Sequence, residues 1–182
     1  MPDCVDVNAK FIEALAKLYR EDYSLIERKC SERSIVFRLG LYLANSLITS
    51  GLTVDCEYNR NGEEPKSLMG KRFTYPDIIV HSRGDNENNR LVVEVKTPND
   101  TDTEHFQKDR EKLIGFTQEL FYRYEQGVHV YIEATTCSLV WYVNGEIRER
   151  SRYAVNSDAH ELSETQHNGN VFDKWYNKYF TR

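Results

Sequence analysis

Two short apolar runs constrain the fold of this chain more than any other feature. Residues 78–80 read Ile-Ile-Val and residues 91–95 read Leu-Val-Val-Glu-Val, so apolar side chains fall on both faces of each expected strand. A strand with two apolar faces belongs in the interior of a sheet that is covered on both sides. The pattern therefore predicts a central sheet with helices packed against it.

Three charged residues accompany these runs. Asp77 directly precedes the first run, and Glu94 and Lys96 lie two residues apart in the second, so their side chains share one face of the strand. A charge in a covered sheet is costly to bury unless it is paired or bound to a metal. If the two runs are neighbouring strands, two carboxylates and an ammonium converge, which predicts a divalent-metal site with a cation beside it.

The rest of the pattern predicts an α/β fold. Helical spacing of apolar residues indicates three helices, the second with Ser31 as its N-cap, and aromatic residues near the C-terminus favour a fourth. The expected helices span residues 7–27, 31–50, 103–126 and 171–180; the expected strands span 52–58, 74–81, 90–96, 128–133 and 138–143. Residues 59–72 are polar and predict a loop. Three antiparallel strands followed by a helical crossover predict a mixed five-stranded sheet in a three-layer α/β/α arrangement.

Length and composition narrow the class of protein. The 182 residues suit a single domain, with an N-terminal helix in residues 1–30, a core in 31–144 and an extension in 145–182. Apolar residues make up 40% and charged residues 29% of the chain, as in globular proteins. No apolar stretch has the length of a membrane span, and residues 1–6 lack the layout of a signal peptide, so we expect a cytoplasmic protein with no membrane partner.

Net charge and cysteine spacing exclude two further classes. A formal net charge of −5 argues against a generally basic surface for nucleic acid, although it allows a local basic patch. The four cysteines form no CxxC or Cys/His cluster, which argues against a zinc site and favours reduced thiols.

Glu32 adds a third acidic candidate. It follows Ser31 and lies near the middle of the apolar stripe of the second expected helix, on the side of Val36 and Leu39. One interpretation is a first-turn glutamate that favours the positive helix N-terminus. The other is a third carboxylate of the metal site, which the presence of Asp77 and Glu94 favours.

These residues resemble the PD-(D/E)xK nuclease superfamily, which has the restriction-endonuclease-like fold. The resemblance consists of Pro76-Asp77, then Glu94-Val95-Lys96, with Glu32 in the helix before three strands. It covers residues 31–133, and the order of elements matches the αβββαβ core of that superfamily. The signature is short, and its placement on two adjacent strands gives it most of its specificity.

The resemblance implies a role for each residue. Asp77, Glu94, the backbone carbonyl of Val95 and Glu32 would bind Mg²⁺ or Mn²⁺, hard cations that prefer oxygen ligands. Lys96 would position the attacking water and stabilise charge on the scissile phosphate. The four side chains would form the catalytic set of a metal-dependent nuclease that hydrolyses phosphodiester bonds, with DNA as the expected substrate. The competing interpretation is an ordinary surface ion pair between Glu94 and Lys96, with Asp77 as a strand-entry residue.

Two further sets are candidates for contact with nucleic acid. Lys108 and Lys112 share a face of the third helix and would reach phosphates, although a solvated helix face explains them equally well. Gln118 and Tyr122 resemble the QxxxY element of the recombination-type exonuclease branch, unless Tyr122 simply packs in the core.

Basic residues flank the two key strands and could form a local DNA-facing patch. They are Lys66, Lys71, Arg72, Arg83 and Arg90. Surface charge unrelated to binding is the competing explanation.

Two alternatives to the nuclease remain open. The first is a non-catalytic nucleic-acid or protein-binding module on the same fold, and the second is a structural subunit whose charges are ordinary salt bridges. Membership of the superfamily would also make a homodimer or a larger nuclease complex an expected assembly, since two active sites are needed to cut both strands.

Overall fold

The computed structural model describes residues 5–61, 64–68, 70–72, 74–84, 86–99 and 102–167. Its helices are α1 (Val7–Glu27), α2 (Glu32–Ser46) and α3 (Thr103–Gln118). The main strands are β1 (Thr53–Cys56), β6 (Ile78–His81), β7 (Leu91–Lys96), β8 (Gln126–Ile132), β9 (Thr136–Val143), β10 (Glu146–Val155) and β11 (Leu162–His167). The pairs β2 (Arg60–Asn61) with β3 (Glu64–Pro65) and β4 (Ser67–Leu68) with β5 (Lys71–Arg72) form two short hairpins.

The main strands form one seven-stranded sheet in the order β1-β6-β7-β8-β9-β10-β11. β1, β6 and β7 pair antiparallel, and β7 pairs parallel with β8 after the crossover through α3, as predicted. The pairs from β8 to β11 are antiparallel. The predicted count of five strands is wrong, because β10 and β11 extend the sheet. β10 is rich in charged residues and lacks the apolar pattern of the inner strands. Most of its side chains are half-buried.

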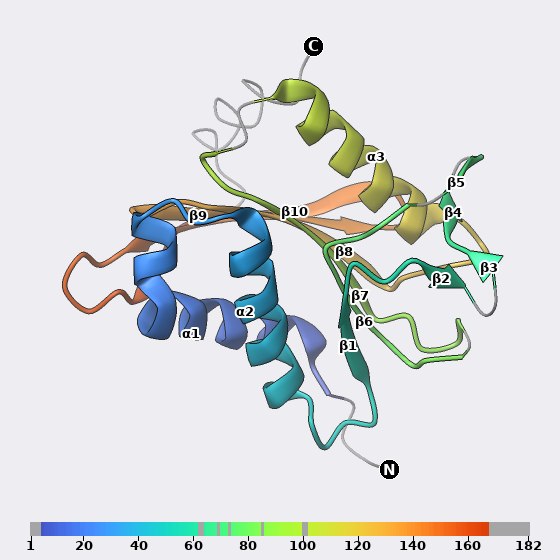
Figure 1. Ribbon diagram of the computed structural model, residues 1–182, viewed down its shortest axis with the longest axis horizontal. Helices are drawn as coiled ribbons and strands as arrows, with labels where there is room; N and C mark the ends of the chain where they lie inside the picture. The colour runs from blue at the N-terminus through green and yellow to red at the C-terminus, as the bar shows by residue number, and fades with distance from the viewer. Residues whose placement is uncertain are drawn as a thin grey trace.

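Helices cover both faces of the sheet, with α1 and α2 on one side and α3 on the other (Figure 1). Val80, Val93 and Val95 pack in the core formed with α1 and α2. Ile79 and Val92 pack in a second core with α3. β6 and β7 are therefore buried on both faces, as their two apolar faces predict.

The helices α2 and α3 end earlier than their sequence patterns predict. α2 ends at Ser46 rather than Ser50, and α3 ends at Gln118 rather than at residue 126. Glu119 takes an extended conformation, and Leu120, which extends the apolar spacing of α3, is 82% exposed. Tyr122 and Tyr124 are buried, but they reach the core from a turn and not from a helix. Gly127, predicted to stop the helix, lies in β8.

Two segments that were predicted without regular structure contain strands. Residues 59–72, predicted as a loop, carry the two short hairpins. The predicted extension from residue 145 supplies β10 and β11 to the main sheet. The predicted helix over residues 171–180 lies outside the described residues. Among the described helices, none is both long and apolar enough to cross a membrane.

Candidate active site

Neighbouring strands bring Asp77 and Glu94 to the same part of the sheet. Asp77 directly precedes β6, and its Oδ2 accepts a hydrogen bond of 2.7 Å from the backbone N–H of Val95. Glu94 lies in the middle of β7 and is 1% exposed. The structure thus places the carboxylate of Asp77 against the backbone that carries Glu94, as the sequence predicts for two adjacent strands.

Glu94 and Lys96 face α3, which adds two charged residues of its own. Asp109 and Lys112 lie one turn apart on this helix, and Asp109 is 5% exposed. Lys112 donates to Glu94 Oε2 at 2.8 Å and to Asp109 Oδ1 at 2.9 Å. The site is therefore built from the two neighbouring strands together with α3, and not from the strands alone.

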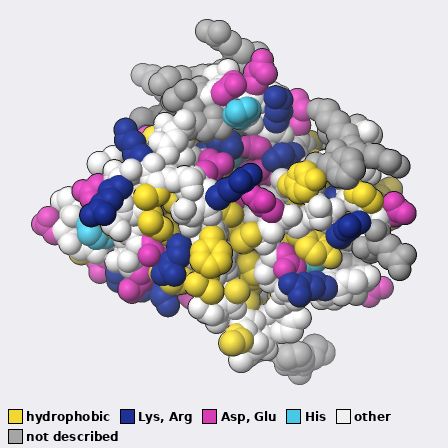
Figure 2. All heavy atoms as spheres, viewed as in Figure 1, with side chains coloured by type: hydrophobic (Ala, Val, Ile, Leu, Met, Phe, Trp, Pro, Cys, Tyr) yellow, Lys and Arg dark blue, Asp and Glu magenta, His cyan; other side chains and the backbone are white. Residues whose placement is uncertain are grey.

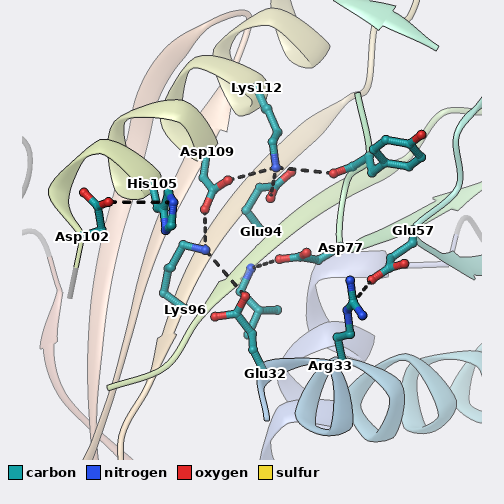
Figure 3. A network of polar contacts seen from close by, with 12 residues as sticks. Glu32, Arg33, Glu57, Asp77, Glu94, Lys96, Asp102, His105, Asp109 and Lys112 are labelled. Carbon is teal, nitrogen blue, oxygen red and sulfur yellow. Dashed lines mark hydrogen bonds and ion pairs between the residues drawn. The ribbon is translucent and has the colours of Figure 1, made fainter. Parts of the chain in front are cut away.

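Lys96 completes a chain of ion pairs that crosses the site (Figure 3). Its Nζ lies 2.7 Å from Asp109 Oδ2 and 3.6 Å from Glu32 Oε1. Charges of opposite sign therefore alternate from Glu94 to Lys112, Asp109, Lys96 and Glu32. Glu32 is the first residue of α2, and its side chain is 30% exposed. Glu32 also lies in the first turn of α2 next to the Ser31 N-cap, as the helix-terminus interpretation predicts. Its role in a metal site stays a prediction.

Asp109 is the member of this cluster that the sequence prediction missed. It lies three residues after Phe106 and four before Leu113, both fully buried, so it belongs to the apolar face of α3. The same criterion identified Glu32. Asp109 was not predicted as a buried site residue because residues 107–112 alternate in charge, which is typical of a solvent-exposed helix face.

Burial shifts the two central carboxyl groups toward their neutral forms. Burial raises the pKa of Asp77 to about 6, against the hydrogen bond from Val95, which lowers it. Burial also raises the pKa of Glu94 well above its usual range, with further contributions from the nearby Asp77 and Asp109. In the absence of a metal, these two carboxylates are held at an electrostatic cost.

The other charges of the cluster stabilise one another. Burial opposes the charge of Asp109, but Lys112 and Lys96 outweigh it and lower its pKa. Burial likewise opposes the charge of each lysine. Asp109 and Glu32 nevertheless raise the pKa of Lys96, and Glu94 and Asp109 raise that of Lys112. Both lysines therefore carry a full positive charge at neutral pH.

His129 borders the cluster without adding charge. It pairs with Glu94 across β7 and β8 and is 4% exposed. Burial lowers its pKa to about 4, although Asp109 opposes this shift. The imidazole is therefore neutral at physiological pH.

The cluster has the donor chemistry of a Mg²⁺ or Mn²⁺ site. Its carboxylates are hard oxygen ligands, and Oε1 of the buried Glu94 has no hydrogen-bond partner among the described residues. Four carboxylates and two ammonium groups leave two formal negative charges, which one divalent cation would balance. Within the described ranges, no three His, Cys, Asp or Glu side chains are arranged to hold a metal. The Lys112 ammonium instead lies against Glu94.

The candidates for nucleic-acid contact on α3 do not share one location. Lys112 belongs to the cluster, whereas Lys108 is exposed and lies 3.7 Å from Glu104. Gln118 is exposed at the end of the helix. Tyr122 is 2% exposed, and its hydroxyl donates to the carbonyl of Ser67 at 2.8 Å and accepts from its N–H at 3.1 Å. This placement is the core packing that the alternative interpretation describes.

The described residues of the predicted basic patch lie in different environments. Lys66 is 2% exposed, so its assignment to a DNA-facing surface is wrong. Arg83 pairs with Asp55, and Arg90 with Glu125 at 3.0 Å. The side chains of Lys71 and Arg72 lie outside the described part. Figure 2 shows positive and negative side chains intermixed on the face viewed there.

Comparisons with known proteins give little further information. No family model matches the sequence, and no curated protein matches it. A chain of the cryoEM structure of a DrdV–DNA complex is similar over 75% of this chain, at 19% identity and a TM-score of 0.48. The matched region spans 12% of the length of that chain.

Proposed function

We propose that this protein is a divalent-metal-dependent nuclease that hydrolyses phosphodiester bonds in DNA. The observation that carries the proposal is the buried Glu94 beside Asp77, with a lysine on the same strand and one Glu94 carboxylate oxygen that no described residue contacts by a hydrogen bond. Most buried polar atoms in proteins have a hydrogen-bond partner, so a free oxygen on a fully buried carboxylate favours an additional ligand such as a metal. The resemblance to PD-(D/E)xK nucleases rests on these same residues.

The residues have distinct roles in this proposal. Asp77, Glu94 and the carbonyl of Val95 would hold Mg²⁺ or Mn²⁺, and Glu32 would hold it directly or through water. The metal would polarise the phosphoryl oxygen and acidify the attacking water. Asp109 keeps Lys96 charged and in place. The Lys96 ammonium would orient the water and stabilise negative charge that builds on the scissile phosphate.

The proposal is tested by cleavage of defined substrates. Wild-type protein, Lys96→Ala and the surface control Lys10→Ala are incubated with linear, supercoiled, nicked and single-stranded DNA and with RNA, with Mg²⁺, Mn²⁺ or EDTA. Lys10 lies on α1, on the opposite side of the sheet, and pairs only with Glu13 in the described contacts. We expect metal-dependent cleavage that Lys96→Ala lowers by more than about 100-fold. Absence of cleavage by folded wild-type protein on all substrates would reject the proposal.

A non-catalytic binding module is the second candidate. The observation that favours it is the ion pair of 2.8 Å between Lys112 and Glu94, which gives the buried carboxylate a counter-ion without a metal. This candidate predicts DNA or protein binding that is unchanged by EDTA, and no detectable binding of Mn²⁺ by calorimetry.

A further inference from the structure

Lys112 lies on the carboxylate that the proposed nuclease needs for its metal. Its three ammonium protons have three acceptors: Glu94 Oε2 at 2.8 Å, Asp109 Oδ1 at 2.9 Å and the carbonyl of Tyr75 at 3.4 Å. The dashed contacts in Figure 3 show this convergence from α3, β7 and the segment before β6. Lys112 is thus placed as a counter-ion of Glu94.

A counter-ion is needed at this point because of burial. Glu94 is 1% exposed, and an isolated buried carboxylate is strongly destabilising. Lys112 supplies the positive charge through Oε2, and Oε1 has no hydrogen-bond partner in the part of the chain that the structure describes. The carboxylate therefore keeps one oxygen for a further ligand that the described side chains do not supply.

The two lysines of the cluster differ in access to solvent. The side chain of Lys96 is 7% exposed and lies between Asp109 and Glu32, whereas that of Lys112 is 26% exposed. Lys112 has a flexible four-carbon stem, and it can leave Glu94 while it remains beside Asp109. Lys96 is more enclosed, which suits a fixed position.

We propose that Lys112 occupies Glu94 in the metal-free protein and competes with the divalent cation for that carboxylate. This inference rests on the proposed metal site. A metal on Glu94 would repel the ammonium, which would move away from Oε2 while Asp109 keeps it in the site. The released ammonium is then available to a phosphate oxygen of the substrate, so metal loading and phosphate contact are coupled through one side chain.

The experiment is a calorimetric titration of Mn²⁺ at pH 8 into wild-type protein and three variants, without substrate. Lys112→Gln removes the charge but keeps a hydrogen-bond donor, Lys112→Arg keeps the charge, and Lys10→Gln removes a surface charge far from the site. Two charges of the same sign a few ångströms apart repel strongly at any protein dielectric constant. We expect Lys112→Gln to bind Mn²⁺ at least about tenfold more tightly than wild type. Lys112→Arg and Lys10→Gln should stay within about threefold of wild type.

The outcomes separate this inference from the proposed function. Tighter binding by Lys112→Gln, including binding that only this variant shows, supports the competition. Equal or weaker binding by folded Lys112→Gln overturns it and leaves the metal site intact. If no protein binds Mn²⁺, the proposed metal site fails and the competition fails with it.

A measurement on wild-type protein covers the case in which Lys112→Gln does not fold. The side-chain NMR signals of Lys112 and Lys10 are followed during titration with Mg²⁺. Competition predicts that the Lys112 signals shift with metal saturation while those of Lys10 do not. Unchanged Lys112 signals in protein that calorimetry shows to be saturated would overturn the inference.

Discussion

The carboxylate of Asp109 joins the two lysines of the candidate site, with Lys96 Nζ at 2.7 Å from Oδ2 and Lys112 Nζ at 2.9 Å from Oδ1. One helix residue thus fixes a lysine of β7 and a lysine of its own helix. Lys96 is 7% exposed and Lys112 26% exposed, so solvent would replace Asp109 only in part as a partner of these ammonium groups. The stability of the site depends on this carboxylate.

Asp109→Asn should therefore destabilise the protein by roughly 3 kcal/mol, because two buried ammonium groups lose their shared anion. Chemical denaturation at pH 7 measures the change. Glu104→Gln is the matched control, since Glu104 lies on the same helix in an exposed ion pair of 3.7 Å with Lys108. The control should change the free energy of unfolding by less than about 0.5 kcal/mol. Equal effects of the two substitutions would contradict the role assigned to Asp109.

Tyr122→Phe should lower stability without affecting catalysis. The Tyr122 hydroxyl bonds both the N–H and the carbonyl of Ser67, and its loss should cost about 1–2 kcal/mol. Thermal or chemical unfolding measures this cost, and the nuclease assay is run on Tyr122→Phe and Gln118→Ala together. If both variants lose cleavage activity while folded, the QxxxY interpretation is correct and the packing interpretation is wrong.

Lys66 should make stability depend on pH in the alkaline range. Its ammonium lies 4.9–5.9 Å from the ring centroids of four aromatic residues and donates to the Tyr124 hydroxyl at 3.2 Å. Burial lowers its pKa from 10.5 to about 8, although Asp55 opposes the shift. Between these values the unfolded chain binds more protons than the folded protein, so this group makes the free energy of unfolding rise with pH.

Lys66→Met removes this dependence and fills the same aromatic pocket. The variant should be more stable than wild type by about 2 kcal/mol at pH 7, and the difference should shrink toward zero by about pH 10.5. Denaturation of both proteins from pH 7 to 10.5 measures it, and ionisation of tyrosines and cysteines cancels in the difference. Lys10→Met is the control for the loss of a lysine charge at a more exposed position on α1. A difference between Lys66→Met and wild type that does not change with pH would show that the buried aromatic pocket does not lower the pKa of Lys66.

Gly115→Ala should destabilise the contact between α3 and the β4–β5 hairpin. A Cβ at Gly115 would lie 2.9–3.0 Å from three side-chain carbons of Leu68, which is 4% exposed. Overpacking of this kind costs about 1–3 kcal/mol, more than alanine gains in helix propensity. Chemical denaturation should show that Gly115→Ala costs less in a Leu68→Ala background, because the shorter side chain leaves room. Additive effects of the two substitutions would contradict the close contact.

The sequence by itself determined the central part of the fold. Residues 78–80 and 91–95 carry apolar side chains on both faces of their strands. Only the interior of a sheet that is covered on both sides buries both of these faces. The spacing of Asp77, Glu94 and Lys96 then follows from strand geometry, since side chains two apart share a face. The helices α1 and α2 begin where the sequence predicts, because Asp6 and Ser31 are local N-caps of these helices.

The ends of α2 and α3 and the outer strands depended on tertiary contacts. Periodicity continues past Gln118, but the chain turns there so that Tyr122 can bond Ser67, a residue 55 positions earlier. β10 has no apolar alternation of its own and is a strand because it pairs with β9 along most of its length. The Tyr122–Ser67 contact is not local, so no local pattern could predict it. The β9–β10 hairpin is local and turns at Asn144-Gly145, but the extent of β10 depends on its pairing with β9 and β11 and not on an apolar pattern.

The same distinction applies to the candidate site. Sequence spacing indicated the carboxylates and the lysine of β7, whereas only packing of α3 on the sheet brought Asp109 between two lysines and Lys112 onto Glu94. On α3 these residues occupy a run of alternating charge that resembles any solvated helix face. Whether a charged side chain on α3 is solvated or buried depends on the element that packs against it. The crossover connection places α3 over β7 and β8, and this packing buries Asp109.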